Sequence, residues 1–243
     1  MKPAESWVAE YEQRGYVAVP NLLSTNELAE LRQRIDDIQE GRVVIDGATY
    51  EPSDGSGVSV AARPAMRKLT DLAPVDPLFR RIACKREIVD IAAELIGRAR
   101  HVLLYADQAL LKPAHHGSAK PLHQDNSYFH VAPMDFGVTC WLAIDDATVE
   151  NGCMNYIPES HKLGLIPHRE IANTPHRVPT AENLDAEVPC PVPAGSAIFH
   201  HLLTLHSSKA NQSPQPRRAW ALHYLNAEAR CGKDTTSMLT VRM

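Results

Sequence analysis

Apolar residues in the first hundred positions recur at the spacing of helices. One stretch places four aliphatic residues on a single helical face: Leu28, Leu31, Ile35 and Ile38. Ser24 and Glu27 precede this face as a capping-box pair, which favours a helix beginning there. The pattern over 86–95 predicts another helix that ends near Gly97. We therefore expect residues 1–100 to be mainly helical.

Beyond His101 the apolar positions form short runs separated by Pro, Gly and Asn. These runs predict strands over 101–111, 138–144, 153–157, 196–202 and 219–225. A shorter β-like run lies at 16–19. Several short strands behind two helices indicate a mainly β fold with flanking helices, built on a double-stranded β-helix (a jelly-roll, cupin-like core) over 101–226.

Two stretches lack sustained periodicity. Residues 41–64 are rich in Gly, Ser, Asp and Pro, so we expect a long loop and a candidate lid. The Pro-rich stretch 167–193 is expected to be an excursion between strands. The length of 243 residues suits one domain with a substantial core, and we expect the whole chain, 1–243, to form it.

Charge narrows the classes of partner. The formal net charge is -4 and no basic run is present, which argues against nucleic acid. No segment has the apolar length of a secretory signal or a membrane span, so we expect a cytoplasmic protein that acts on a small molecule. The 5 cysteines are scattered and are interpreted as reduced thiols, while the 12 histidines prompt a search for metal-ligand spacing. The oligomeric state is not indicated.

His123 and Asp125 are the first candidate metal ligands. On a strand, residues two apart point to the same face, so an imidazole and a carboxylate can converge on one ion. Such a pair is weak evidence alone, because chance alone gives roughly one in a chain of this composition. His168 and Glu170 offer a similar pair, but a Pro-rich loop would hold ligand geometry poorly.

His206, on a later predicted strand, would complete a set of two imidazoles and one carboxylate. This facial triad suits Fe(II), which keeps adjacent positions open for a keto acid and O₂. Arg217 follows on the next strand, where its guanidinium suits the far carboxylate of 2-oxoglutarate. Arg218 is adjacent, and strand alternation allows only one of the two to face the site.

These residues resemble the pattern of the phytanoyl-CoA dioxygenase family of Fe(II)/2-oxoglutarate oxygenases. The resemblance spans roughly 68–224 and rests on His-Gln-Asp at 123–125, Trp-Leu-Ala-Ile-Asp-Asp at 141–146, Glu-Asn-Gly-Cys-Met at 150–154, Ile-Pro-Glu-Ser-His at 157–161, and His206 through Arg217. It implies a jelly-roll core, His123, Asp125 and His206 as iron ligands and catalytic centre, and Arg217 as the 2-oxoglutarate partner. It further implies co-substrate contacts from Lys68, Trp141 and Ser208.

The resemblance predicts a dioxygenase that hydroxylates an unactivated C–H bond of a small metabolite while 2-oxoglutarate yields succinate and CO₂. Asp125 favours a hydroxylase over the related halogenases, in which a small residue frees a metal position. Gln124 and Asn126 are expected on the opposite strand face as support for the ligands. Two alternatives stay open: a non-catalytic metal-binding jelly-roll module and a zinc-dependent hydrolase. The prime substrate is not indicated.

Overall fold

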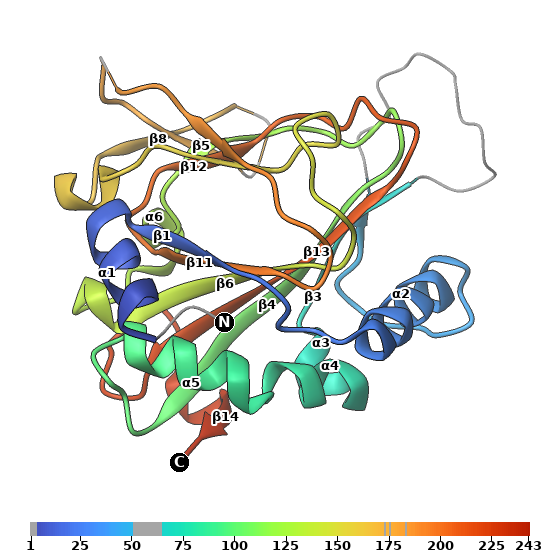
Figure 1. Cartoon of the computed structure of the whole chain (residues 1–243), viewed down its shortest axis with the longest axis horizontal. Helices are drawn as coiled ribbons and strands as arrows, with labels where there is room; N and C mark the ends of the chain where they lie inside the picture. The colour runs from blue at the N-terminus through green and yellow to red at the C-terminus, as the bar shows by residue number, and fades with distance from the viewer. Residues whose placement is uncertain (1–3, 51–64, 173, 175, 183) are drawn as a thin grey trace.

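A large antiparallel sheet, the major sheet, forms the centre of the molecule (Figure 1). The computed structural model describes residues 4–50, 65–172, 174, 176–182 and 184–243. In spatial order the major sheet contains β1 (Tyr16–Val19), β11 (Ala197–His201), β6 (Gly137–Ala143), β13 (Arg217–Asn226), β4 (Val102–Lys112), β3 (Met66–Thr70) and β2 (Thr49–Tyr50), with β14 (Leu239–Arg242) paired to β4.

A smaller sheet, the minor sheet, lies over one face of the major sheet (Figure 1). Its strands, in order, are β10 (Val188–Cys190), β7 (Met154–Tyr156), β12 (His206–Ser208) and β5 (Lys120–His123). A separate antiparallel pair is formed by β8 (His168–Glu170) and β9 (Arg177–Pro179). The two facing antiparallel sheets constitute the expected double-stranded β-helix.

Helices cover the opposite face of the major sheet. They are α1 (Ala4–Arg14), α2 (Thr25–Gln39), α3 (Leu72–Val75), α4 (Pro77–Ala83) and α5 (Arg86–Leu95), while α6 (Asn126–Phe129) follows β5. Short 3-10 turns occur at Met134–Phe136, Ser160–Leu163 and Thr235–Ser237. The capping box of α2 is present, since the Ser24 hydroxyl accepts from the Glu27 backbone N–H at 3.3 Å and the Glu27 carboxylate accepts from the Ser24 N–H at 2.8 Å.

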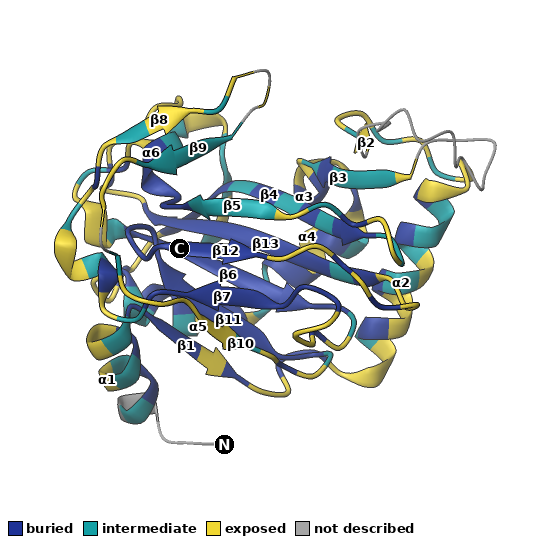
Figure 2. Cartoon of the chain, turned by 90° about the horizontal axis from the view of Figure 1, so that it is seen from above, coloured by how far each residue is buried: buried dark blue, intermediate teal, exposed yellow. Residues whose placement is uncertain are grey.

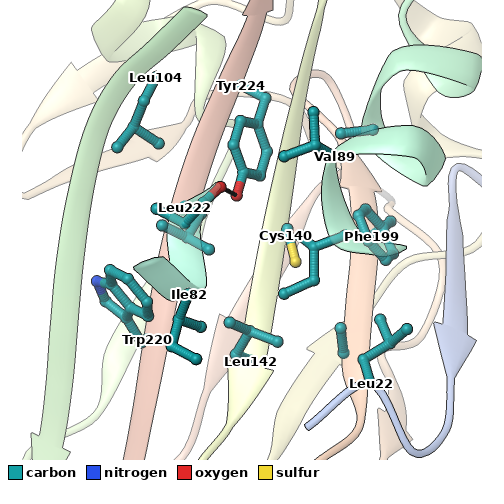
Figure 3. Close-up of a cluster of buried hydrophobic side chains, with 14 of the residues drawn as sticks. Leu22, Ile82, Val89, Leu104, Cys140, Leu142, Phe199, Trp220, Leu222 and Tyr224 are labelled. Carbon is teal, nitrogen blue, oxygen red and sulfur yellow. Dashed lines mark hydrogen bonds between the residues drawn. The ribbon is translucent and has the colours of Figure 1, made fainter. Parts of the chain in front are cut away.

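The core lies between the helices and the major sheet. Figure 2 shows that the central strands of this sheet are buried. Along β13, alternate residues Trp220, Leu222 and Tyr224 point into this helical layer (Figure 3). The Tyr224 hydroxyl donates to the Ala83 carbonyl at 2.8 Å, so a buried polar atom is satisfied. The intervening residues of β13 face the minor sheet instead, and they line the site described below.

The predicted helices over 28–38 and 86–95 and all five predicted strand runs are confirmed. The core boundary at 101–226 is wrong, because β1, β2, β3 and β14 lie outside it and pair within the major sheet. The run at 16–19 is confirmed as β1, whereas β2, β3 and β14 lack the continuous apolar run of a buried strand. The Pro-rich excursion also contains β8, β9 and β10. Most of the candidate lid, 51–64, lies outside the described residues.

The five cysteines are free thiols, as expected. Among the described residues, no helix combines the length and the apolar character needed to cross a membrane.

Candidate metal centre

Two imidazoles meet across the minor sheet. His206 of β12 pairs directly with His123 of β5, and their ring centroids lie 4.2 Å apart. Each ring is fixed by its Nδ1: the His123 Nδ1–H donates to the Pro121 carbonyl at 2.8 Å, and the His206 Nδ1–H donates to the Thr204 carbonyl at 2.9 Å. Carbonyls only accept, so in both rings Nε2 is left with a free lone pair.

Asp125 completes the group, although not from the strand on which it was predicted. The strand β5 ends at His123, and Asp125 has helical backbone angles just before α6. This turn still directs the carboxylate to the imidazoles, with Asp125 Oδ1 3.6 Å from His123 Nε2 and 3.7 Å from His206 Nε2. One ligand atom from each of the three residues lies within 4.8 Å of the others, which is the spacing of a metal site.

The second oxygen of Asp125 is held by hydrogen bonds. Asp125 Oδ2 accepts from the Thr139 hydroxyl at 2.6 Å and from His200 Nε2 at 3.1 Å. The Tyr156 hydroxyl lies 3.0 Å from His200 Nδ1 and donates to it, which fixes the ring of His200. Since Thr139 gives its only proton to Asp125, His223 Nδ1–H must donate to the Thr139 oxygen at 2.9 Å. These bonds leave only Oδ1 of Asp125 for a metal.

Burial and local charge put the three residues in their ligand forms. Burial lowers the pKa of His206 to about 3, with a further contribution from His123. Burial likewise lowers the pKa of His123. Burial opposes ionisation of Asp125, but the neighbouring His206 and the hydrogen bond from His200 hold its pKa well below the ordinary value. At neutral pH the site therefore presents two neutral imidazoles and one carboxylate, which is the protonation state that metal binding requires.

A cavity of about 370 Å³ opens beside the three residues, between the two sheets. The predicted residues all line it: Lys68, His123, Asp125, Trp141, His206, Ser208 and Arg217. Sequence reasoning did not single out other lining residues that matter below: Arg67, Lys120, Thr139, His176, His200 and His223. His200 and His223 lie on predicted strands, at alternate positions that face the cavity, so strand alternation could have identified them.

Arg217 is a buried cation within this cavity. Its side chain is 2% exposed, and its Nε and Nη1 atoms have no hydrogen-bond partner among the described residues. Burial lowers its pKa to about 10, so it stays charged at neutral pH. Arg218 faces the opposite way and binds Asp145 at 2.8 Å and Asp36 at 2.9 Å. Arg217 is therefore the arginine of the pair that faces the cavity.

The cavity wall carries further unpaired polar atoms. The Trp141 indole N–H and the His223 Nε2 atom are buried and have no partner within the described part of the chain. The tautomer imposed by Thr139 makes His223 Nε2 an acceptor, whereas Trp141 and Arg217 offer only donors. Buried polar atoms normally have hydrogen-bond partners, so these atoms indicate that the cavity binds a polar ligand. The Arg217 guanidinium lies 5.3 Å from the Trp141 ring centroid, which places both donors in one corner.

The alternative pair of His168 and Glu170 does not form a site among the described residues. The expected reason was wrong, because the pair lies on strand β8 and not in a loop. His168 is instead engaged through both nitrogens, with Nε2 accepting from the Gln124 N–H at 3.2 Å and Nδ1 donating to the Ile166 carbonyl at 2.7 Å.

Gln124 and Asn126 point away from the cavity and brace the loops around the ligands. The Gln124 amide donates to the carbonyls of Gly164 and Leu203 at 2.9 and 2.6 Å, and its oxygen accepts from the Ile166 N–H at 2.8 Å. Asn126 bonds both backbone groups of Val131. They flank Asp125 in a turn and not on the strand face that was predicted.

Residues 11–219 match the family model described as phytanoyl-CoA dioxygenase (PhyH). A probable phytanoyl-CoA dioxygenase of Caenorhabditis elegans is 30% identical over 233 residues, covering 89% of this chain and 73% of the relative. A methylphosphonate hydroxylase of Gimesia maris is 30% identical over 222 residues, covering 90% of this chain and 80% of the relative. The crystal structure of the epimerase SnoN with Fe³⁺, alpha-ketoglutarate and nogalamycin RO superposes with a TM-score of 0.74 at 26% identity, covering 93% of this chain and 84% of that one.

Proposed function

The chain belongs to the phytanoyl-CoA dioxygenase family, and we propose that it hydroxylates a C–H bond of a small molecule by using Fe(II), 2-oxoglutarate and O₂. One observation carries this proposal: a ligand-ready triad shares a single cavity with a buried arginine that has no counter-ion among the described residues. The triad accounts for the metal, and the arginine accounts for a dicarboxylate that reaches it. Neither residue set alone would select this chemistry.

His123 Nε2, Asp125 Oδ1 and His206 Nε2 would hold the iron. Two nitrogens and one carboxylate oxygen form the donor set that suits non-haem Fe(II), and hydrogen bonds to Asp125 Oδ2 keep that carboxylate monodentate. When bound, Fe(II) couples the oxidative decarboxylation of 2-oxoglutarate to insertion of oxygen into the substrate.

Arg217 would bind the far carboxylate of 2-oxoglutarate. Its Nε and Nη1 have no hydrogen-bond partner among the described residues, and both are charged donors from which a carboxylate can accept. The free Trp141 indole N–H lies in the same corner. Ser208, buried on β12, and half-buried Lys68 on β3 line the cavity as further co-substrate contacts. Burial lowers the pKa of Lys68, so a carboxylate beside it would restore favourable surroundings for its charge.

The remaining cavity residues would place the prime substrate. His223 Nε2 offers a hydrogen-bond acceptor to a substrate hydroxyl or amine. Burial of the ligands, at 4–6% exposure, keeps bulk water from the reacting centre. A zinc-dependent hydrolase would have no use for a buried, unpaired arginine beside its metal. A non-catalytic module would have no reason to keep such costly unpaired groups.

Anaerobic spectroscopy followed by product analysis tests this function. Purified protein with Fe(II) should develop a weak visible charge-transfer absorption when 2-oxoglutarate is added, and exposure to O₂ should release succinate and CO₂ in equal amounts. The Asp125→Ala variant should show neither signal. Absence of the absorption in wild-type protein that binds zinc tightly would favour the hydrolase instead.

A further inference from the structure

A second basic cluster lies in the cavity apart from Arg217. It consists of Arg67 on β3, Lys120 on β5 and His176 just before β9, and all three residues line the cavity. Arg67 Nη2 lies 3.0 Å from His176 Nε2, and Lys120 Nζ lies 3.0 Å from His176 Nδ1. The imidazole is thus held between two cations, one on each ring nitrogen.

The two ring nitrogens of His176 cannot both form a hydrogen bond with these cations. Guanidinium and ammonium groups only donate hydrogen bonds. Burial, Lys120 and Arg67 lower the pKa of His176 to about 4, so its ring is neutral at pH 7 and carries one N–H. Whichever nitrogen bears that proton, its N–H is directed at another donor. Among the described residues, no acceptor is recorded that would satisfy this N–H between Arg67 and Lys120.

The described lining of the cavity also lacks a counter-charge for this cluster. Its only carboxylate is Asp125, whose oxygens face the metal position, Thr139 and His200. The neighbouring Lys112 gives its ammonium to the carbonyls of Ser118 and Lys209. Burial lowers the pKa of Lys120 to about 8; Asp125 opposes this change, and the charges of Arg67 and Lys68 add to it. An oxyanion in contact with Arg67 and Lys120 would supply both the acceptor and the counter-charge that the described residues of the cluster lack.

We propose that Arg67 and Lys120, with His176 between them, bind an oxyanion of the prime substrate, a carboxylate or a phosphonate. This inference rests on the proposed function, and it assigns the substrate class. Lys120 precedes His123 by three residues on one strand, or about 10 Å of backbone. Tyr128 links the two sites, with its ring 5.1 Å from Lys120 Nζ and its centroid 5.9 Å from that of His123. The anchored anion would therefore belong to a small molecule whose other end reaches the metal position.

Paired probes of different charge test this assignment, and butanoate and butanamide also have nearly the same shape. The full-length protein is titrated calorimetrically with methylphosphonate against its neutral dimethyl ester, and with butanoate against butanamide. Each titration is run on metal-free protein and again under anaerobic conditions with Fe(II) and 2-oxoglutarate. At least one anion should bind about 10-fold or more tightly than its neutral partner in both states, because charge-assisted hydrogen bonds are worth that much.

Variants assign the preference to the cluster. Arg67→Gln and Lys120→Gln should each lower the affinity for the preferred anion by roughly 10-fold. Both variants should keep the absorption that 2-oxoglutarate produces. Arg169→Gln, which changes an exposed arginine of β8 that does not line the cavity, is the matched control and should change neither.

The proposal is overturned if neither anion is preferred, or if both variants keep the preference. It is also overturned if added 2-oxoglutarate abolishes the preference, since the anions would then occupy the co-substrate site at Arg217. A wild-type protein without the 2-oxoglutarate absorption contradicts the proposed function instead, while the metal-free titrations still decide the anion site.

Discussion

The two faces of the major sheet differ sharply although the same strands build both. On β13, Trp220, Leu222 and Tyr224 enter the apolar layer under the helices (Figure 3). Arg217 and His223 of the same strand line the cavity. On β6 and β11 the same alternation sends Cys140, Leu142 and Phe199 outward, and Thr139, Trp141 and His200 inward. A shift of one residue in any of these strands would exchange the faces.

The outer face of the major sheet contributes mainly to stability, and the inner face contributes mainly to binding. The outer face is closely packed and apolar, so it supplies the burial that holds the sheet together. On the inner face, Arg217 and His223 bury polar atoms that have no hydrogen-bond partner among the described residues. This arrangement lowers the stability of the protein until a ligand binds. Substitutions on one face should therefore change unfolding, and substitutions on the other should change binding.

The largest effect is expected at the inner face, from Asp125→Ala. Loss of the only carboxylate in the proposed ligand set should abolish detectable Fe(II) binding, because two neutral imidazoles retain little affinity. Metal content after dialysis measures it. His168→Ala removes the imidazole of the alternative pair and should leave metal content unchanged. The opposite pattern would move the metal centre to the β8 region.

The outer face is tested by Leu222→Ala. Leu222 is fully buried, so this change should lower the free energy of unfolding by about 2–5 kcal/mol. Urea unfolding measures the loss. The folded fraction should keep its affinity for Fe(II) and 2-oxoglutarate. If iron affinity fell while stability did not, the separation of the two faces would be refuted.

Arg217 and its neighbour test the alternation within one strand. Arg217→Ala should weaken 2-oxoglutarate binding by about 100-fold, which corresponds to the loss of two charge-assisted hydrogen bonds. Titration of the charge-transfer absorption measures it. Arg218→Ala removes the contacts to Asp145 and Asp36 on the other face, so it should reduce stability modestly and leave the titration unchanged. Equal co-substrate affinity in the two variants would disprove the assignment.

Thr139→Val tests whether the hydrogen bond from Thr139 to Asp125 supports metal binding. The valine has the shape of threonine but cannot donate to Asp125 Oδ2, so Fe(II) affinity should fall by about 10-fold or somewhat more. Competition with a chelator measures the change, and Thr139→Ser should restore the affinity. Failure of serine to restore it would mean that packing matters at this position and hydrogen bonding does not.

The smallest effect concerns pH and the second basic cluster. With a pKa of about 8, Lys120 is charged below that pH and loses its charge as the pH rises through it. Binding of methanesulfonate, whose own charge is constant, should therefore weaken by up to about 10-fold between about pH 7 and 9. The groups that face Lys120 are Arg67, Lys68, Asp125, Tyr128 and His176.

Among these groups, the pKa of Asp125 lies well below its ordinary value, that of His176 is about 4 and that of Tyr128 is raised, so these three do not titrate in this window. Lys120→Gln should remove most of the pH dependence, and Lys68, whose pKa is also lowered by burial, is the remaining lysine beside the site. A wild-type affinity that stays constant across the same range would remove Lys120 from the anion site.

Local patterns in the sequence predicted the elements that carry their own signal. The capping box and apolar face of α2, and the apolar runs of β4, β6, β11 and β13, were sufficient to identify these elements. The strand β3 was not predicted, because its sequence Met-Arg-Lys-Leu-Thr is amphipathic and its pairing with β4 is a tertiary contact.

The candidate site also contains residues with a local sequence signal and residues that only tertiary contacts bring together. Spacing and residue type selected His123, Asp125, His206 and Arg217, although the turn that carries Asp125 was taken for a strand. The cluster of Arg67, Lys120 and His176 depends on three segments meeting across the cavity. Nothing in their local sequences marks them as neighbours, so only the folded chain could identify them.

A crystal structure of the protein grown anaerobically with Fe(II) and 2-oxoglutarate tests the central claim most directly. It should show iron bound to His123 Nε2, Asp125 Oδ1 and His206 Nε2, with the far carboxylate of 2-oxoglutarate on Arg217. Iron held by other residues, or an Arg217 side chain without a carboxylate beside it, would contradict the account.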